Sequence, residues 1–131
     1  MKTIHNPPEL FNSTQYGFSQ VVASSGGRTV RMSGQVAMDA DENVLGGTIG
    51  EQMPHAMRNV EIALAAGGAR LDDVVSMTIY FRADRIHETS AISETLRTFF
   101  PEKPPATSWI GVVTLSREAF LVELEAVAVV A

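Results

Sequence analysis

The sequence predicts one α+β domain, in which two helices cover a single face of a β-sheet. Five segments have the residue composition of β-strands, with side chains that alternate between two faces in 28–38 and 74–81. Two further segments repeat apolar residues at the spacing of α-helices. The chain of 131 residues is long enough for one ordinary hydrophobic core and leaves little room for a second. The expected order of elements is β-β-α-β-α-β-β, within a single domain over residues 1–131.

The first two strands are expected at about 18–23 and 28–38. Residues 1–15 are polar, contain prolines and show no periodicity, so they are expected to form an irregular arm. Gly26 and Gly27 lie between the two strands and indicate a hairpin, because glycine accepts the positive φ of both turn positions. Along the second strand the side chains alternate between two faces. One face carries Val30, Met32, Gly34 and Val36, and the other carries Thr29, Arg31, Ser33 and Gln35.

Two helices are expected at about 51–66 and 87–100, because their apolar residues recur at helical spacing. The first helix is expected to end at Gly67 and Gly68, since the residue after a helix often takes a left-handed conformation. The second is expected to stop before Pro101. The apolar stripes are Met53, Met57, Val60 and Leu64 in the first helix, and Ile92, Leu96 and Phe99 in the second.

The remaining strands are expected at about 74–81, 106–115 and 119–130. Because two helices cover only one face of such a sheet, the other face must be solvated or buried against another chain. The residues expected on that face are too apolar for free water, which predicts an oligomer whose sheets pack together. They include Val74, Leu121, Val127 and Val129.

Composition and charge exclude several classes of function. The formal net charge of -5, from 10 basic and 15 acidic residues, disfavours binding to nucleic acid. The absence of cysteine excludes disulfides and thiolate chemistry. No segment resembles a signal peptide or is apolar enough over a sufficient length to span a bilayer. The protein is therefore expected to be soluble, without a membrane partner and, by default, cytoplasmic.

Neither a metal nor a cofactor is expected. His5, His55 and His87 lack the spacing of metal ligands, and they are expected to be solvated surface residues. The chain contains no P-loop and no dinucleotide-binding fingerprint. Its glycine pairs are expected to serve in turns and helix caps.

Two carboxylates interrupt the apolar last strand. Glu123 and Glu125 are two residues apart, so both side chains are expected to point to the same face. Burying a carboxylate alone is unfavourable, which leaves two interpretations open. Either both carboxylates face water or bind surface arginines, or one of them lies at the edge of a pocket. A carboxylate at a pocket edge can position a water molecule or move a proton.

Two further segments are candidates for ligand binding. Residues 33–35 (Ser-Gly-Gln) place a glycine in mid-strand, which marks either close approach by a ligand or another backbone, or a bulge or tight helix packing. Thr107 and Ser108 open a strand directly after two prolines, where hydroxyls and backbone amides can bind a carboxylate. Trp109 is expected either to pack in the core or an interface, or to line a pocket.

In this order and spacing, the segments resemble the Rid superfamily, also called YjgF or RidA-like, with the older label endoribonuclease L-PSP. The similarity extends from about Tyr16 to Val129. It is carried by Ser33-Gly34-Gln35, Asn59-Val60, Gly67-Gly68, Phe99-Phe100, the run from Glu123 to Ala128, and Pro105-Ala106-Thr107-Ser108, where the family has Pro-Ala-Arg-Ser. The resemblance implies a chorismate-mutase-like α+β fold with a mixed sheet. It also implies a homotrimer whose three sheets form a central barrel, with small-molecule clefts between adjacent subunits.

The resemblance further implies an activity and a set of site residues. In the deaminating branch of the family, the cleft hydrolyses enamines and imines such as 2-aminoacrylate to 2-oxo acids and ammonia. Glu123 matches the glutamate that positions water, and is the expected catalytic residue. Phe18 falls where a tyrosine is found and Ser93 where an asparagine is found. The expected substrate-binding residues are Phe18, Ser33, Gly34, Ser93, Thr107, Ser108 and Trp109.

Thr107 takes the place of the family arginine that clamps the substrate carboxylate. A neutral hydroxyl does not replace a contact with charge that contributes about 1.5–3 kcal/mol, so efficient deamination of 2-aminoacrylate is not expected. Arg31 and Arg82 are candidates to supply a cation from a new position, with surface solvation as the alternative for each.

The expected function is hydrolysis or deamination of a different imine, enamine or related small metabolite. One alternative is a binding protein that holds a small carboxylate or imine metabolite without turning it over. Another is a ribonuclease or translation inhibitor, which the acidic balance and the missing basic patch disfavour.

Overall fold

Six β-strands and two α-helices make up the regular structure of residues 2–131, the part of the chain that this computed structural model describes. In chain order they are β1 Lys2–His5, β2 Val21–Ser24, β3 Arg28–Arg31, α1 Ile49–Ala66, β4 Val74–Arg82, α2 Ser90–Phe99, β5 Ala106–Val112 and β6 Val122–Val130. Short 3-10 helices lie at Ser13–Tyr16, Leu71–Asp73 and Ala83–Glu88.

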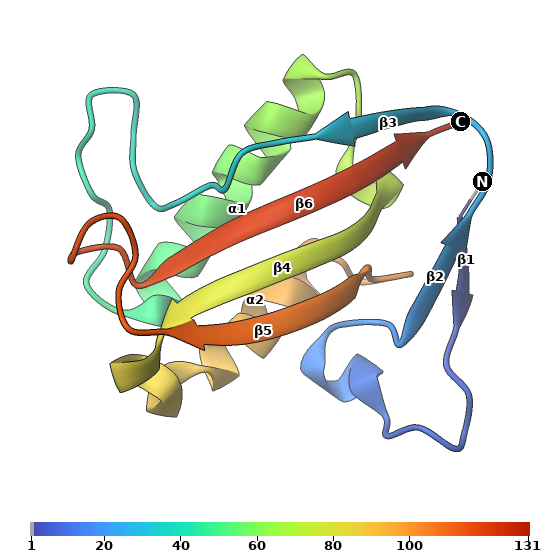
Figure 1. Ribbon diagram of the computed structural model, residues 1–131, viewed down its shortest axis with the longest axis horizontal. Coiled ribbons are helices and arrows are strands. Elements are labelled where there is room, and N and C mark those ends of the chain that lie inside the picture. Colours follow the sequence, from blue (N-terminus) through green and yellow to red (C-terminus); the bar gives the residue numbers. More distant parts are fainter. Residues whose placement is uncertain (1) are drawn as a thin grey trace.

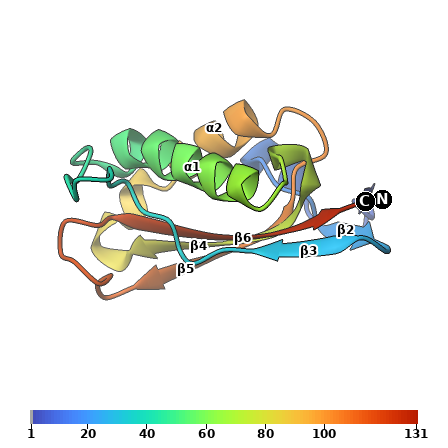
Figure 2. The same cartoon turned by 90° about the horizontal axis from the view of Figure 1, so that it is seen from above.

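A four-stranded mixed sheet in the order β3-β6-β4-β5 lies at the centre of the fold (Figure 1). The pair β4 and β5 is parallel, whereas β6 runs antiparallel to both of its neighbours. Helices α1 and α2 pack side by side on one face, and the opposite face, called here the open face, is uncovered (Figure 2). The predicted α+β architecture, with two helices on one face of the sheet, is confirmed.

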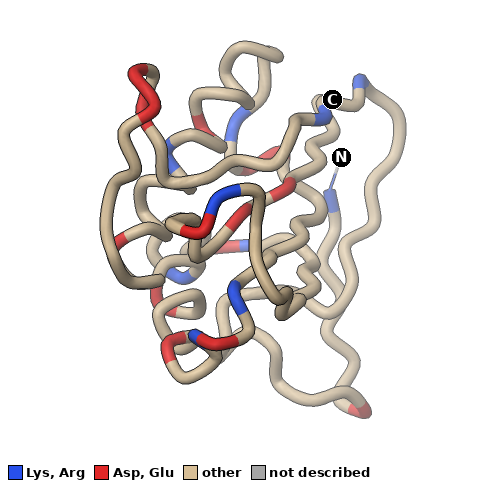
Figure 3. Tube along the Cα trace, turned by 60° about the vertical axis from the view of Figure 1, so that its left-hand side comes forward, with Lys and Arg blue, Asp and Glu red and all other residues tan. Residues whose placement is uncertain are grey.

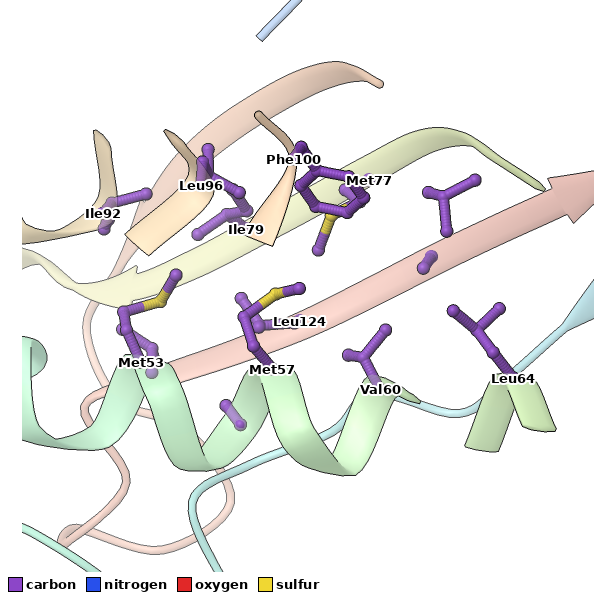
Figure 4. Close-up of a cluster of buried hydrophobic side chains, with 14 of the residues drawn as sticks. Met53, Met57, Val60, Leu64, Met77, Ile79, Ile92, Leu96, Phe100 and Leu124 are labelled. Carbon is purple, nitrogen blue, oxygen red and sulfur yellow. The ribbon is translucent and has the colours of Figure 1, made fainter. Parts of the chain in front are cut away.

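The core lies between the helices and the sheet, where the predicted apolar stripes meet β4 and β6 (Figure 4). Helix α1 begins where Thr48 accepts a hydrogen bond from the Glu51 amide at 3.1 Å, and it ends at Gly67 as predicted. Helix α2 is shorter than predicted, because a separate 3-10 helix occupies the chain just before it. Fully buried core side chains include Met53, Met57, Val60, Leu64, Ile79, Ile92, Leu96 and Leu124.

Two of the four apolar residues expected on the open face lie in the core instead. A register shift between Val74 and Ser76 turns Val74 toward the helices, where it is fully buried. Leu121 precedes β6 and is also buried in the core cluster. Val127 and Val129 remain on the open face and are half-buried. A bulge of this kind shifts every side chain before it to the other face, which simple alternation along the sequence does not reveal.

The predicted hairpin at Gly26 and Gly27 is wrong, although both residues have positive φ (63° and 78°). Strand β2 pairs with β1, whereas β3 pairs with β6. A Cβ on Gly27 would lie 2.0 Å from the Val130 carbonyl oxygen, so the chain passes directly against the end of β6. The glycines therefore form a corner between two sheets rather than a hairpin turn.

The arm is also more ordered than the sequence predicts. Residues 2–5 form β1, which pairs antiparallel with β2, and residues 13–16 form a 3-10 helix. Lys2 connects the two-stranded β1–β2 sheet to β4, because its ammonium group donates a hydrogen bond to the Val74 carbonyl at 2.7 Å. Ser19 attaches the chain beside β5, with its amide donating to the Pro105 carbonyl at 2.9 Å. The two paired strands are about twenty residues apart in the sequence, and a strand of four residues is too short for its local pattern to indicate that pairing.

One fully buried side chain on α1, that of Gln52, is polar. Its amide nitrogen donates to the carbonyl oxygens of Gly46 at 3.0 Å and Ala119 at 2.8 Å. Its amide oxygen accepts from the Leu121 N–H at 2.9 Å. Gln52 thus joins α1 to the loop before it and to the segment that leads into β6.

The N-terminus of α1 is held by a carboxylate from another element. Glu88 accepts from the Arg85 guanidinium at 2.6 Å and from the Ile49 N–H at 2.8 Å. The ion pair with Arg85, followed by the Ile49 amide, holds the pKa of Glu88 below its ordinary value. A negative charge at a helix N-terminus is stabilising, because it faces the positive end of the helix dipole.

Glu88→Gln is therefore expected to lower the free energy of unfolding by about 0.5–1 kcal/mol at neutral pH. The native carboxyl has a lowered pKa, so its contribution is present above the unfolded-state pKa and is lost as the pH falls through the native one. Urea unfolding of both proteins between pH 7 and pH 3 measures this. A difference that stays constant down to pH 3 would contradict the assignment.

In the part of the chain that the structure describes, no helix is long and apolar enough to cross a membrane.

Candidate functional site

Glu123 lies on the open face of β6, beside the segment that follows β3. Its strand partner is Tyr80 on β4, and Glu125 is paired with Thr78 on the same face. The prediction that Glu123 and Glu125 point to one face is confirmed by the alternating burial of β6, in which both are half-buried between fully buried neighbours. The carboxylates therefore belong to the surface that the helices leave uncovered.

Gly34 provides the space for the Glu123 side chain. A Cβ on Gly34 would lie 2.1 Å from the Glu123 Oε2 atom and 2.7 Å from its carboxyl carbon. The neighbouring residue Gln35 fixes this register, because its N–H and C=O both bond to Leu124 at 2.8 Å. The strand predicted over 28–38 ends at Arg31, so Gly34 lies after β3 rather than in mid-strand. The group that approaches it closely is the Glu123 carboxylate side chain, and not the ligand or backbone that the sequence suggested.

A shallow pocket of about 370 Å³, called here the sheet pocket, contains Glu123. The Tyr80 hydroxyl donates to Glu125 Oε1 at 2.7 Å. That hydrogen bond, together with desolvation and the two nearby carboxylates, raises the pKa of Tyr80. Glu123, in contrast, accepts no hydrogen bond and forms no ion pair within residues 2–131. The sheet pocket is lined by Tyr80, Thr114, Leu115, Ser116, Glu123 and Glu125.

A second pocket, of about 410 Å³, lies at the β5 edge of the sheet on the helix side and is called here the edge pocket. Trp109 lines it, and the Trp109 indole N–H donates to the Thr107 hydroxyl at 3.0 Å. The Phe18 ring packs on Trp109 with ring centroids 5.9 Å apart. Its lining consists of Gln15, Tyr16, Thr89, Ser90, Ser93, Glu94, Arg97 and Trp109.

The structure divides the predicted site residues between these two places. Ser93 and Trp109 line the edge pocket, and Phe18 and Thr107 contact Trp109. Glu123 and Gly34 lie together on the other side of the sheet. Within one chain the sheet separates the expected catalytic residue from most of the expected binding residues.

Ser33 and Ser108 are not brought to either pocket. Both residues are exposed. Ser108 is paired with Thr78 and points to the open face, whereas the preceding residue, Thr107, points to the helix face. Several pocket residues were not predicted from the sequence, among them Tyr16, Tyr80 and Arg97. Tyr80 alternates with the buried Ile79 and Phe81 along β4, and this alternation is a signal that it shares the face of Glu123.

The two arginines considered as replacements for the missing cation differ in their surroundings. Arg82 forms a bidentate pair with Asp84, at 3.1 and 2.6 Å, and also donates to the Glu118 carbonyl. Arg31 is exposed at the β3 edge of the open face and lines a small hollow with Glu125. It has no hydrogen-bond partner in the described chain. Arg82 is therefore occupied, and neither arginine lies in the edge pocket.

The described residues contain no group of three or more His, Cys, Asp or Glu side chains arranged to hold a metal ion. His87 is exposed just before α2 and His5 is exposed in β1, whereas His55 on α1 is half-buried. The chemistry available to the two pockets is that of carboxylates, hydroxyls, one guanidinium and aromatic rings.

Comparison with known proteins places this arrangement in a family. Residues 11–130 match the family model described as endoribonuclease L-PSP. The chain is 33% identical to a 2-iminobutanoate/2-iminopropanoate deaminase of Dermatophagoides farinae, over 79% of this chain and 80% of that protein. It is 30% identical to the mitochondrial protein mmf1 of Schizosaccharomyces pombe, over 97% of this chain and 75% of that protein.

Solved structures agree with the sequence matches. A protein of unknown function of the conserved Rid family, YyfB from Yersinia pestis, superposes with a TM-score of 0.92 at 31% identity, over 98% of both chains. Rv2704 from Mycobacterium tuberculosis superposes with a TM-score of 0.69 at 30% identity, over 99% of this chain and 100% of that one. The chain therefore belongs to the endoribonuclease L-PSP family, that is, to the Rid superfamily.

Proposed function

We propose that this protein is a hydrolase of the imine-deaminase type, which converts a 2-imino acid and water into a 2-oxo acid and ammonia. Its similarity to proteins named 2-iminobutanoate/2-iminopropanoate deaminase supports this reaction class. In the reaction, water adds to the imine carbon and gives a carbinolamine. The C–N bond of the carbinolamine then breaks, ammonia leaves and the C=O bond forms.

The observation that carries the proposal is the state of Glu123. Its carboxylate opens into the sheet pocket, accepts no hydrogen bond within residues 2–131, and is seated over Gly34. A carboxylate without a partner is free to accept a hydrogen bond from a water molecule and to take its proton as the water attacks. The same carboxyl group can then return the proton to the departing nitrogen. Glu125 is less suited to this role, because its carboxylate already accepts a hydrogen bond from the Tyr80 hydroxyl.

The active site is proposed to be shared between copies of the chain in a homotrimer. Two observations support this arrangement. Glu123 and the edge pocket lie on opposite sides of the sheet, so one chain alone does not present both to a small substrate. The open face also carries half-buried Val127 and Val129, which contact with another sheet would cover (Figure 2). Sedimentation equilibrium is expected to give a mass three times that of the chain.

The substrate is proposed to be a small metabolite other than 2-aminoacrylate. Thr107 supplies only a hydroxyl, and this hydroxyl accepts the indole N–H of Trp109. The distribution of charge also supports a small ligand over RNA. Lys and Arg are scattered among Asp and Glu along the chain (Figure 3), and the formal net charge is -5.

The proposal is tested by following the release of 2-oxo acids from imines that are generated in solution by oxidation of the parent amino acids. The purified protein is expected to accelerate hydrolysis of at least one 2-imino acid well beyond the rate in buffer. 2-Aminoacrylate is expected to be a poor substrate. Rates equal to buffer for a series of small, branched and aromatic imines would reject the reaction, and detectable binding of the product acids would then favour a non-catalytic binding protein.

Gly34→Ala is expected to lower the turnover number by about 100-fold with little change in stability. The added methyl group would overlap the Glu123 carboxylate and displace it by an ångström or more, and misplacement on that scale costs about two orders of magnitude in rate. Because the displaced atoms are the end of a flexible side chain, the fold is expected to be retained. Steady-state kinetics and thermal unfolding measure the two effects.

Gly47→Ala is the matched control. A Cβ at Gly47 would meet only Glu51 Oε1, at 3.9 Å, and therefore fits without displacing any group. Its turnover is expected to equal that of the wild type. If Gly34→Ala retained full turnover, the position of Glu123 over Gly34 would not matter for catalysis.

A further inference from the structure

We propose that Arg97 binds the substrate carboxylate in the edge pocket, and that the substrate is a 2-imino acid with an aromatic or large apolar side chain. This inference rests on the imine hydrolysis proposed above and assigns the substrate class to it. The edge pocket lacks a cation at Thr107, whose hydroxyl is already engaged by Trp109. Arg97 supplies a guanidinium in the same pocket from a different element, α2.

The guanidinium of Arg97 is available for a ligand. It donates from Nη1 to the Gln15 carbonyl at 2.5 Å, and it makes no ion pair with any carboxylate in residues 2–131. The remaining N–H groups of its planar fork are free for a carboxylate, which an arginine binds through two parallel hydrogen bonds. Three other arginines are already paired, namely Arg82 with Asp84, Arg85 with Glu88 and Arg117 with Glu42.

Ser93 adds a second donor one helical turn before Arg97. Ser93 as a whole residue is 7% exposed, and its side chain forms no hydrogen bond in the described chain. No fully buried side-chain polar atom among the described residues lacks a partner, so the Ser93 hydroxyl must reach the pocket it lines. Residues four apart lie on the same side of a helix, which lets Ser93 and Arg97 address one carboxylate together.

The arm holds the other wall of the pocket against α2. Gly17 has a φ of 91°, and a Cβ there would lie 2.8 Å from the Leu96 Cβ and 3.1 Å from the Ser93 carbonyl oxygen. This close contact brings Gln15 and Tyr16 over the pocket. The segment before β2 is therefore part of the binding site rather than an irregular extension.

Aromatic rings form the apolar side of the edge pocket. Tyr16 and Trp109 line it directly. Phe18 packs on Trp109 at 5.9 Å, and Phe11 contacts Phe18 at 6.2 Å and Tyr16 at 6.4 Å between ring centroids. A volume of about 410 Å³ lies within the range of about 300–1,000 Å³ typical of pockets that bury ligands much larger than a three-carbon acid. Offset or edge contacts with these rings favour an aromatic or large apolar side chain.

Glu94 provides a negative charge that complements the positively charged imine group of such a substrate. It lines the edge pocket beside Arg97 and forms no ion pair with it. The protonated imine of a 2-imino acid carries a positive charge next to its carboxylate. A guanidinium and a carboxylate on one pocket rim therefore match both charges of the substrate, whereas either residue alone would match one.

The test uses unreactive probes and the fluorescence of Trp109, which is the only tryptophan of the chain and lines the pocket. The probes are 3-phenylpropionate, its neutral amide 3-phenylpropionamide, and propionate. Wild-type protein is expected to bind 3-phenylpropionate more tightly than either of the other two. Arg97→Met is expected to weaken 3-phenylpropionate binding by tenfold or more and to leave the affinity for the amide unchanged, because only the carboxylate uses the guanidinium.

Two variants control for charge and for structure. Arg97→Lys keeps a donor for the Gln15 carbonyl but loses the fork, and is expected to give an intermediate affinity. Arg31→Met removes an unpaired arginine on the open face, and is expected to bind all three probes as the wild type does.

Each outcome decides the inference. Binding of 3-phenylpropionate that is no tighter than that of its amide, or that is unchanged in Arg97→Met, overturns it, and so does a loss confined to Arg31→Met. Because these probes do not react, their binding is measured independently of catalysis. Charge-selective binding without turnover of any imine would reject the proposed function and leave the Arg97 site standing. Turnover with binding insensitive to Arg97 would do the reverse.

Discussion

Glu123→Gln is expected to reduce imine hydrolysis by about 10²–10⁴-fold, the range that general acid–base groups contribute. The amide preserves the size of the side chain and its contact with Gly34, but it does not accept a proton from the attacking water at neutral pH. Substrate and product binding are expected to change little. The measurement is the turnover number on a 2-imino acid together with the affinity for an unreactive carboxylate probe.

Glu125→Gln is the matched control, since it makes the same change two residues further along the same face. The Glu125 carboxylate accepts a hydrogen bond from the Tyr80 hydroxyl, which is the main cause of the raised pKa of Tyr80. Removing the negative charge of Glu125 is therefore expected to lower the pKa of Tyr80, while most of the turnover is expected to remain. An ultraviolet titration of Tyr80 in a Tyr16→Phe background reports that shift. Equal losses of turnover in both variants would mean that the pair of carboxylates, rather than Glu123 alone, acts on the substrate.

Glu123→Gln also distinguishes between the two candidate functions, an imine hydrolase and a non-catalytic binding protein. If the wild type binds carboxylate probes but does not hydrolyse any imine, Glu123→Gln has no rate to lower and the protein belongs to the second class. A protein that hydrolyses imines and keeps its full rate without the Glu123 carboxylate would require another base. No other unpaired carboxylate lines the sheet pocket, because Glu125 is bonded to Tyr80.

Gln52→Leu is expected to lower the free energy of unfolding by about 1–3 kcal/mol. The substitution keeps a large side chain in a fully buried site but removes all three hydrogen bonds of the amide. The buried Leu121 N–H would be left unpaired, and a buried polar group without a partner costs about that amount. Gly46 and Ala119 are exposed residues, so their carbonyl oxygens are expected to bond to water instead. Urea unfolding at neutral pH measures the change.

Gln15→Leu is the matched control, because it makes the same glutamine-to-leucine replacement at an exposed position. Gln15 is exposed and its amide makes one hydrogen bond, to the Asn12 carbonyl at 2.9 Å. Its replacement is expected to alter stability by less than about 0.5 kcal/mol, as is usual for surface positions. Similar effects of the two substitutions would show that the network around Gln52 adds nothing to stability.

Local periodicity predicted the elements whose pattern is set by their own geometry. The stripe from Met53 to Leu64 and the stop at Gly67 follow from the helical repeat and from the conformation needed after a helix end. The shared face of Glu123 and Glu125 follows from the two-residue repeat of a strand. The sequence also identified Gly34 as a place of close approach or a bulge, though not which.

Longer-range features escaped the same reasoning. The pairing of β1 with β2, the corner at Gly26 and Gly27, and the bulge that buries Val74 all depend on which distant segments compete for one another. The burial of Gln52 was not predicted, because only the fold brings Gly46, Ala119 and Leu121 around it. Local spacing carries no information about a partner that lies tens of residues away.

By itself, the sequence determined the apolar stripes of both helices, the shared face of Glu123 and Glu125, the acidic charge and the family to which the chain is similar. Only the tertiary structure decided that the Glu123 side chain fills the space over Gly34, and that Arg97 shares a pocket with Ser93 and Trp109. The physical reason is that periodicity along the chain fixes which way a side chain points. What it meets there depends on long-range packing, which brings together residues that no sequence spacing relates.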